Sequence, residues 1–194
     1  MRQLTHLRSV AVALLALALA PRASVAQAPA YTHADVDIVK AVIAHHAQAL
    51  TMESLAPAHG ASPQVQLLAA EMEIGQREKV QALQAWLKER GQAVPAVADG
   101  HADHDHGVTG AGAGAAEHAH MGGMLTEDQM EELAHARGVR FDRLFLAYMI
   151  QHHQGGITSL GKLTGAAPDV TALAAATVTD EKALVARLQK MIAP

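Results

Sequence analysis

The sequence predicts an all-α protein, an antiparallel four-helix bundle built from two repeated helix hairpins. Aromatic residues are only 3 % of the 194 residues while alanine is abundant, a composition that suits closely packed helices better than sheets. Apolar residues recur at three- and four-residue spacing along four long segments. These segments form two similar halves, and since an isolated helix hairpin cannot bury its apolar face, the halves are expected to pack on each other.

Residues 1–26 are expected to be a signal peptide rather than part of the fold. Arg2 and Arg8 precede an apolar run over residues 10–20 that is too short for a membrane span, and small residues up to Ala26 resemble a cleavage signal. No second apolar run of membrane length follows. We therefore expect a periplasmic or secreted protein, free of the membrane after cleavage, whose single domain spans residues 27–194.

The first hairpin is expected over residues 32–91. Thr32 can cap its first helix, with Asp35 as the reciprocal member of a capping box, and this helix should run to about residue 55. Ser62 can cap the next helix, and Pro63 suits the first helical position. That helix should end at the glycine at position 91.

A flexible linker rich in His and Gly is expected over residues 92–125, where the apolar pattern dissolves. The second hairpin, residues 126–194, opens with a short acidic helix capped by Thr126 and Gln129. A long helix should then run from about residue 140 to about residue 160. The last helix should begin at Pro168 or the following residue and end near residue 192.

An internal repeat relates the two hairpins. Segment 43–46, Ile-Ala-His-His, matches segment 150–153, Ile-Gln-His-His, at an offset of 107 residues. The Pro-started helices align without gaps at an offset of 105, which superimposes Pro63 on Pro168, Val65 on Val170, Leu68 on Leu173, Val80 on Val185 and Leu83 on Leu188. Two related hairpins are expected to pack about a pseudo-twofold axis.

Charge and cysteine content exclude several classes of function. The formal net charge is −4, and loss of the three arginines of the leader leaves 12 of the 15 Lys and Arg against 19 Asp and Glu, or −7. A nucleic-acid partner is therefore not expected. Cysteine is absent, which excludes disulfides, thiolate ligands and a cysteine nucleophile. Any metal chemistry must use His, Met and carboxylates.

Paired histidines and nearby methionines are the candidates for that chemistry. On the first helix the His pair lies on or beside the apolar face, with a methionine further along, and on the matching helix a methionine precedes the His pair by one turn. Together they predict a mixed site between the two helices from His45, His46, Met52, Met149, His152 and His153. Because imidazole suits Cu, Zn and Ni while thioether selects Cu(I), copper is favoured over zinc, and Cu(I) over Cu(II).

Other interpretations stay open. One histidine of each pair could form a core hydrogen bond while the other faces solvent, which would leave a helical structural or interaction module; a Zn-binding homologue is a further alternative. A di-iron enzyme would need a symmetrical carboxylate set, but the Glu-x-x-His motif at Glu132 and His135 lies outside the repeats. No Ser-His-Asp constellation or nucleotide motif is visible, so we predict that the protein is not an enzyme.

The linker offers a second group of candidate metal ligands. These are His104, His106, His118 and His120, which could collect Cu or Zn ions with little geometric selectivity, or could belong to a solvated spacer. Cleavage after Ala30 instead of Ala26 would place His33 third from a new amino terminus that could bind Cu(II) in a square plane. The cut after Ala26 is favoured.

The sequence resembles the family called domain of unknown function 305. The resemblance rests on Phe-Leu-Ala-Tyr-Met-Ile-Gln-His-His-Gln at 145–154, on Ile-Ala-His-His-Ala-Gln-Ala-Leu-Thr-Met at 43–52, and on Gln76, Glu78 and Ala-Trp-Leu at 85–87. It implies export, a ferritin-like four-helix bundle and copper binding through the His and Met residues named above. Val42 stands where a Met is expected before the first His pair, and Ser159 where a later Met is expected, so one composite site and two equivalent sites both remain open.

From these observations we predict an exported protein that sequesters or shuttles copper. The linker would capture ions and the bundle would hold them. A homo-oligomer is compatible with the sequence, which names no protein partner and fixes neither the number of ions nor their oxidation state.

Overall fold

The computed structural model describes residues 31–97 and 121–193. Within these ranges the chain forms five α-helices and no strand: α1 (His33–Leu55), α2 (Pro63–Glu89), α3 (Glu127–His135), α4 (Gly138–Gly161) and α5 (Pro168–Ile192). The all-α prediction is confirmed. The predicted signal peptide, residues 1–26, lies outside the described residues, as does most of the predicted linker. None of the helices described is long and apolar enough to cross a membrane.

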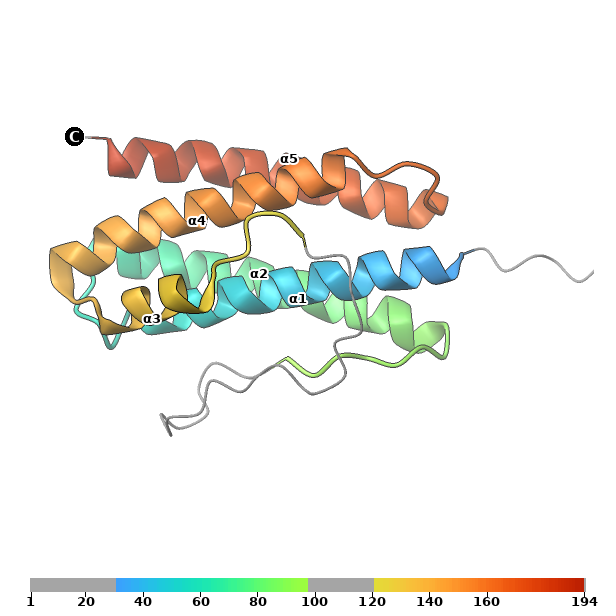
Figure 1. The fold of residues 1–194 in the computed structure, drawn as a ribbon, viewed down its shortest axis with the longest axis horizontal. Coiled ribbons are helices and arrows are strands. Elements are labelled where there is room, and N and C mark those ends of the chain that lie inside the picture. Colours follow the sequence, from blue (N-terminus) through green and yellow to red (C-terminus); the bar gives the residue numbers. More distant parts are fainter. Residues whose placement is uncertain (1–30, 98–120, 194) are drawn as a thin grey trace, which may run out of the picture.

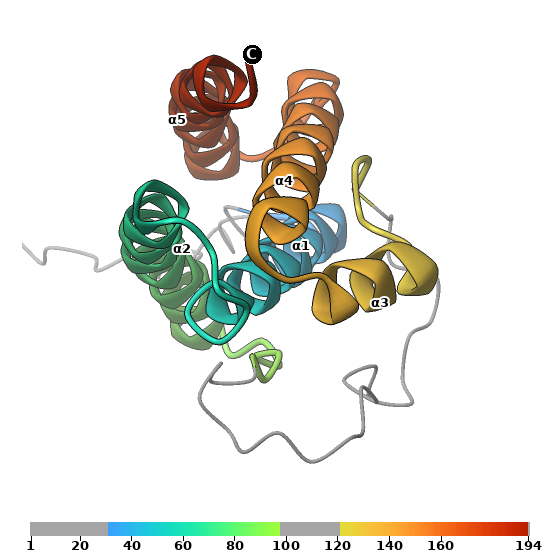
Figure 2. The ribbon, with the colours of Figure 1, turned by 90° about the vertical axis from the view of Figure 1, so that its left-hand side faces the viewer.

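The four long helices form a bundle of two hairpins. α1 pairs with α2 and α4 pairs with α5, and the hairpins meet where α1 lies beside α4 (Figures 1 and 2). The short helix α3 lies on the outside of this meeting line, in contact with both α1 and α4. Each chain reversal within a hairpin is short, so neighbouring helices run antiparallel. The bundle therefore places the middle of α1 opposite the middle of α4.

The predicted caps begin the helices where expected. Thr32 and Asp35 form the capping box of α1, and Thr126 and Gln129 form that of α3. The side chain of Ser62 accepts a hydrogen bond from the third amide of α2. Since these side chains satisfy amides that have no partner inside the helix, they fix each first turn.

Each hairpin also caps a helix of the other. Asp35 on α1 accepts a hydrogen bond from the amide of Ala167 at the start of α5, at 2.8 Å. Its repeat partner Asp142 on α4 accepts one from the amide of Ser62 at the start of α2, at 3.1 Å. These matching bonds show that the repeat in the sequence is a pseudo-twofold relation in space.

Two apolar clusters fill the bundle. One is centred on Met52, Phe141 and Phe145 and the other on Val39 and Ile43, all fully buried. Along α1 the paired histidines fall between members of the two clusters. The core of the bundle is thus divided by a polar layer in its middle.

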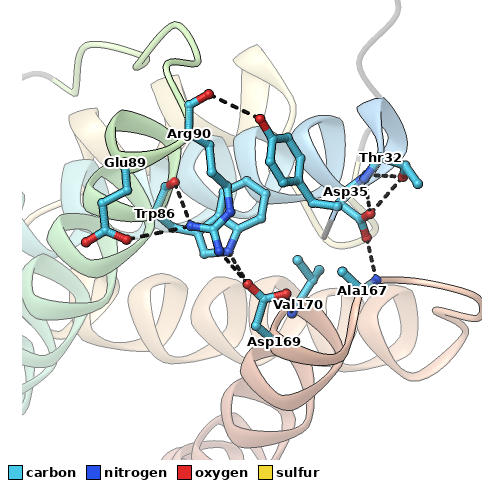
Figure 3. A network of polar contacts seen from close by, with 9 residues as sticks. Thr32, Asp35, Trp86, Glu89, Arg90, Ala167, Asp169 and Val170 are labelled. Atoms are coloured by element: carbon cyan, nitrogen blue, oxygen red, sulfur yellow. Dashed lines mark hydrogen bonds and ion pairs between the residues drawn. The ribbon is translucent and has the colours of Figure 1, made fainter. Parts of the chain in front are cut away.

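An aromatic and ionic network closes the end of the bundle where α1 begins. The guanidinium of Arg90 lies over the ring of Trp86, 4.1 Å from its centroid, and 5.5 Å from that of Tyr31. The same group donates to Asp169 on α5 at 2.8 Å, as does the Trp86 indole at 2.7 Å (Figure 3). The network therefore ties the end of α2 to the beginnings of α1 and α5.

The predicted linker extends too far at its C-terminal end. Residues 121–125 pack against α1 and α4 as a strap, in which Leu125 is buried and its amide and carbonyl both bond to the Gln48 side chain, at 2.7 and 3.1 Å. The amide of Gly122 donates to the hydroxyl of Ser159 at 2.8 Å. A Cβ at Gly155 would lie 2.2 Å from the Gly122 carbonyl carbon, so the strap depends on glycine there.

Candidate metal centre

The two histidine pairs meet in the middle of the bundle. His45 and His46 on α1 are 1 % exposed, and His152 and His153 on α4 are fully buried. The rings of His45 and His152 stack with centroids 3.7 Å apart and an interplanar angle of 18°. Burial of all four contradicts the alternative in which one histidine of each pair faces solvent.

Reciprocal hydrogen bonds hold the stacked pair. Nε2 of His45 donates to the carbonyl oxygen of His152 at 3.2 Å, and Nε2 of His152 donates to the carbonyl oxygen of His45 at 3.1 Å. Because a carbonyl oxygen only accepts, the proton of the neutral His152 ring is assigned to Nε2. Nδ1 of His152 then carries a lone pair, and it has no hydrogen-bond partner.

The second pair of rings is buried without hydrogen bonds. Neither ring nitrogen of His46 or of His153 has a hydrogen-bond partner. A buried polar atom left unsatisfied costs about 1–3 kcal/mol, and such atoms are few in a folded protein. Their concentration at one point of the core is what a site built for a ligand requires.

Helices α2 and α5 add one polar side chain each. Glu181 on α5 is 2 % exposed, and its Oε1 lies 3.7 Å from Nδ1 of His153. Gln76 on α2 is 4 % exposed and lies beside the ring of His46. The oxygens of both side chains lack a hydrogen-bond partner.

Three of these residues can reach one metal ion. One ligand atom each from His45, His46 and Glu181 lie within 4.8 Å of one another. Metal–ligand bonds of about 2.0–2.2 Å place two ligands of the same ion roughly 3–4 Å apart, so small side-chain adjustments close the set. His153 lies next to Glu181 and is a candidate fourth ligand.

Burial keeps the imidazoles neutral. Burial, with a smaller effect from the neighbouring His45 and Lys79, lowers the pKa of His46 to about 3. Burial also lowers the pKa of His45, although the charge of Glu181 opposes this, and it lowers the pKa of His152 well below its usual value. Since only neutral imidazole binds a metal ion, the rings are ready to coordinate at neutral pH.

The remaining predicted ligands lie in different places. Met52 and Met149 are fully buried and belong to the apolar cluster that contains Phe145. Met149 is one helical turn before His152, as the spacing predicted. The linker candidates His104, His106, His118 and His120 lie outside the described residues.

The sequence did not reveal Glu181 and Gln76 as site residues. Under the 105-residue offset Gln76 superimposes on Glu181, so both halves carry a long polar side chain at the same position of a largely apolar stripe. That repeated polar position was the available signal. No acidic residue of α2 is matched by an acidic residue of α5, because the repeat partner of Glu181 is an amide.

The fold and the site define a class of protein: a helical bundle with a buried, histidine-rich centre between its two hairpins. The chain matches the family described as domain of unknown function (DUF305) over residues 35–192, and it belongs to that family. No curated protein gives a significant match.

Solved structures show the same fold. A DUF305 fragment from Deinococcus radiodurans is 26 % identical with a TM-score of 0.67, covering 84 % of this chain and 97 % of the fragment. A DUF305 protein of Streptomyces coelicolor described as secreted is 20 % identical with a TM-score of 0.63, covering 81 % and 91 %. CopM in its Cu(II)-bound form is 20 % identical with a TM-score of 0.58, covering 81 % and 95 %, and CopM in its Cu(I)-bound form is also similar.

Proposed function

We propose that this protein is an exported copper-binding protein that sequesters or shuttles the ion outside the cytoplasm and is not an enzyme. The observation that carries the proposal is the buried layer of imidazoles, with unpartnered nitrogens on His46, His152 and His153 and a carboxylate from Glu181 beside them. The copper-bound forms of CopM, a protein of the same fold, support copper as the ion.

The donor atoms of the centre differ from those on which the sequence prediction of Cu(I) rested. Imidazole and carboxylate, which form the centre, suit Cu(II) and Zn, whereas the thioethers of Met52 and Met149, which would select Cu(I), belong to the apolar cluster that contains Phe145. The sequence favoured Cu(I) because of these methionines, and Glu181 adds a hard oxygen donor that favours Cu(II). Titration against a Cu(I)-selective chelator without oxygen, and against a Cu(II) chelator in air, measures the two affinities separately.

Export and linker capture complete the proposed function. A leader of the signal-peptide type would carry the chain to the periplasm or the medium, where free copper is to be lowered. The linker histidines would collect ions at low selectivity and pass them to the bundle. Changing His104, His106, His118 and His120 together to Ala is expected to slow copper uptake while leaving the ion in the bundle.

Replacing the unpartnered rings tests the bundle site. In the double variant His46→Leu with His153→Leu, we expect the chain to fold with undiminished stability, since buried polar atoms without partners are replaced by apolar groups of similar size. Copper retained against a chelator, measured by native mass spectrometry, should be lost. The exposed His135→Leu on α3 is the matched control and should retain copper.

The opposite result would support the interaction-module alternative. If the histidines are structural, the leucine variant loses stability while copper retention is the same as in the wild type. That outcome would overturn the bundle site, because the two proposals predict opposite changes in both measurements.

A further inference from the structure

The metal centre is symmetric in its histidines and asymmetric in the residues around them. The repeat relates His45 to His152 and His46 to His153, and their positions in space follow the same relation. A site formed by His45, His46 and Glu181 therefore has an equivalent on the opposite side of the pseudo-twofold axis. This equivalent consists of His152, His153 and Gln76.

We propose that the centre holds a single ion, displaced from the pseudo-twofold axis into the half formed by His45, His46 and Glu181. Gln76 and Ala49 prevent the equivalent half from binding an ion. This inference rests on the proposed function and assigns Glu181 as the anionic ligand.

Charge is the first asymmetry. Glu181 offers a carboxylate whose oxygens have no hydrogen-bond partner in the core, whereas Gln76 offers a neutral amide oxygen at the same position. A cation buried among neutral imidazoles needs a compensating negative charge, because the low-dielectric interior penalises a lone ion. Only the half with Glu181 supplies that charge.

Space is the second asymmetry, and it is independent of charge. Gly156 on α4 lies against the site: a Cβ there would be 2.8 Å from Cε1 of His45 and 2.9 Å from Oε2 of Glu181. The missing side chain is what lets this imidazole and this carboxylate approach each other. The repeat places the fully buried Ala49 at the equivalent position of α1, where its methyl group occupies the corresponding space.

The two asymmetries select the same half. Glu181 lies on α5 and Gly156 on α4, whereas the two imidazoles of the same half lie on α1. The ion would therefore join the two hairpins through one composite site, with His153 available as the additional ligand beside Glu181. The donor set of two or three imidazoles and one carboxylate suits a divalent ion of the Cu(II) or Zn class.

Exchanging the residues of the two halves tests the proposal. All variants are made in the full chain with His104, His106, His118 and His120 changed to Ala. Each protein is loaded with Cu(II) or Zn(II), and the ions that it retains against a competing chelator are counted by native mass spectrometry. We expect one retained ion, at least about 10-fold weaker retention in Glu181→Gln, and unchanged retention in the exposed control Glu78→Gln. Glu181→Gln should fold, because it installs the side chain that the other half already carries.

The converse variants create or destroy a site by copying one half onto the other. Gly156→Ala introduces the alanine found at the equivalent position 49 and should weaken retention of the ion as Glu181→Gln does. Ala49→Gly combined with Gln76→Glu introduces the glycine and the carboxylate found at the equivalent positions 156 and 181, and it should add a second retained ion. Two ions in the unmodified bundle, or full retention in Glu181→Gln, would overturn the single composite site. No retained ion in the unmodified bundle would instead overturn the proposed function itself.

Discussion

Burial favours the neutral form of three core histidines, His45, His46 and His152, and this links the stability of the protein to pH. An unfolded histidine titrates near pH 6.5, whereas burial lowers the pKa of His45, His46 and His152 in the fold. Below about pH 6.5 the unfolded chain therefore binds more protons than the folded chain. The stability that depends on these neutral rings is complete above that pH and declines as the pH falls, for His46 down to a pKa of about 3.

Without metal, the free energy of unfolding should fall from pH 7 to pH 5 by up to about 1.4 kcal/mol per pH unit for each of these histidines. Urea unfolding at a series of pH values measures the slope. His46→Leu should reduce that slope, since one titrating group is removed. A free energy that stays constant between pH 7 and pH 5 would show that the rings take up protons in the fold as readily as in the unfolded chain.

Glu53 is a buried acid outside the histidine layer. It is 2 % exposed, and neither of its oxygens has a hydrogen-bond partner. Burial, with the nearby charge of Glu73, raises the pKa of Glu53 well above its usual value, and Arg77 opposes this. A group with a raised pKa favours the fold below the unfolded pKa of about 4.5, and this contribution is lost as the pH rises.

Glu53→Gln should therefore stabilise the protein at pH 7 by about 1 kcal/mol or more and have little effect near pH 4. Denaturant unfolding at the two pH values provides the measurement, with the exposed Glu78→Gln as the control. Equal gains at both pH values would mean that the charge of Glu53 is not what limits stability.

The sequence predicted that the two histidine pairs meet between the hairpins, but it did not reveal the side-chain oxygens of Gln76 and Glu181 beside them. A doublet of histidines repeated in both halves is visible as a pattern, and helical periodicity places it near the apolar face. Periodicity gives the face of a helix and not its depth, so Gln76 and Glu181 could not be told from solvent-facing polar residues. The asymmetry of Gly156 and Ala49 likewise becomes meaningful only when the distances across the core are known.

At the scale of elements, the exchanged caps make each helix start depend on the other hairpin. Asp35 completes the capping box of α1 and also accepts a hydrogen bond from the amide of Ala167, the N-cap residue of α5, which offers no side-chain cap of its own. Burial raises the pKa of Asp35, but the hydrogen bonds from Ala167 and Thr32 outweigh it and hold the pKa below its usual value. Asp142 contributes less to the start of α2, because the side chain of Ser62 already caps that helix.

Asp35→Ala should thus lower the free energy of unfolding by about 1–2 kcal/mol per lost cap, up to roughly 2–4 kcal/mol for both. Asp142→Ala should cost less, and the exposed Asp37→Ala on the same helix should cost little. Denaturant unfolding of the three variants orders them. An equal loss for Asp35→Ala and Asp142→Ala would argue against the double role of Asp35.

Helix boundaries were predicted well because capping is local chemistry. Thr32, Ser62 and Thr126 each begin a helix where the sequence placed it, and Pro168 begins the last one. The strap at residues 121–125 was missed because nothing in its own composition shows that Gly155 on another element leaves room for it. Sequence patterns report local structure, so they could not predict a contact that depends on the fit of two distant segments.

At the scale of the whole molecule, the polar contacts that join the two hairpins include three sets at different positions along the bundle. The exchanged aspartate caps lie towards the two ends of the bundle, the network of Arg90 with Asp169 closes one end, and the histidine layer lies in the middle. The first two are complete in themselves. The middle layer holds most of the buried side-chain atoms without partners, so it is the part of the junction that an ion would strengthen most.

An ion bound by His45, His46 and Glu181 should therefore raise the stability of the whole bundle. Because the ion would bind the folded protein and bridge both hairpins, a free concentration of 100 times Kd adds about 2.7 kcal/mol, or roughly 5–10 °C in Tm for a domain of this size. Calorimetry with and without Cu(II) measures the shift, which should persist in Glu78→Gln and shrink strongly in Glu181→Gln. A shift of the same size in Glu181→Gln would place the stabilising ion elsewhere, because that variant keeps every imidazole and loses only the carboxylate between the hairpins.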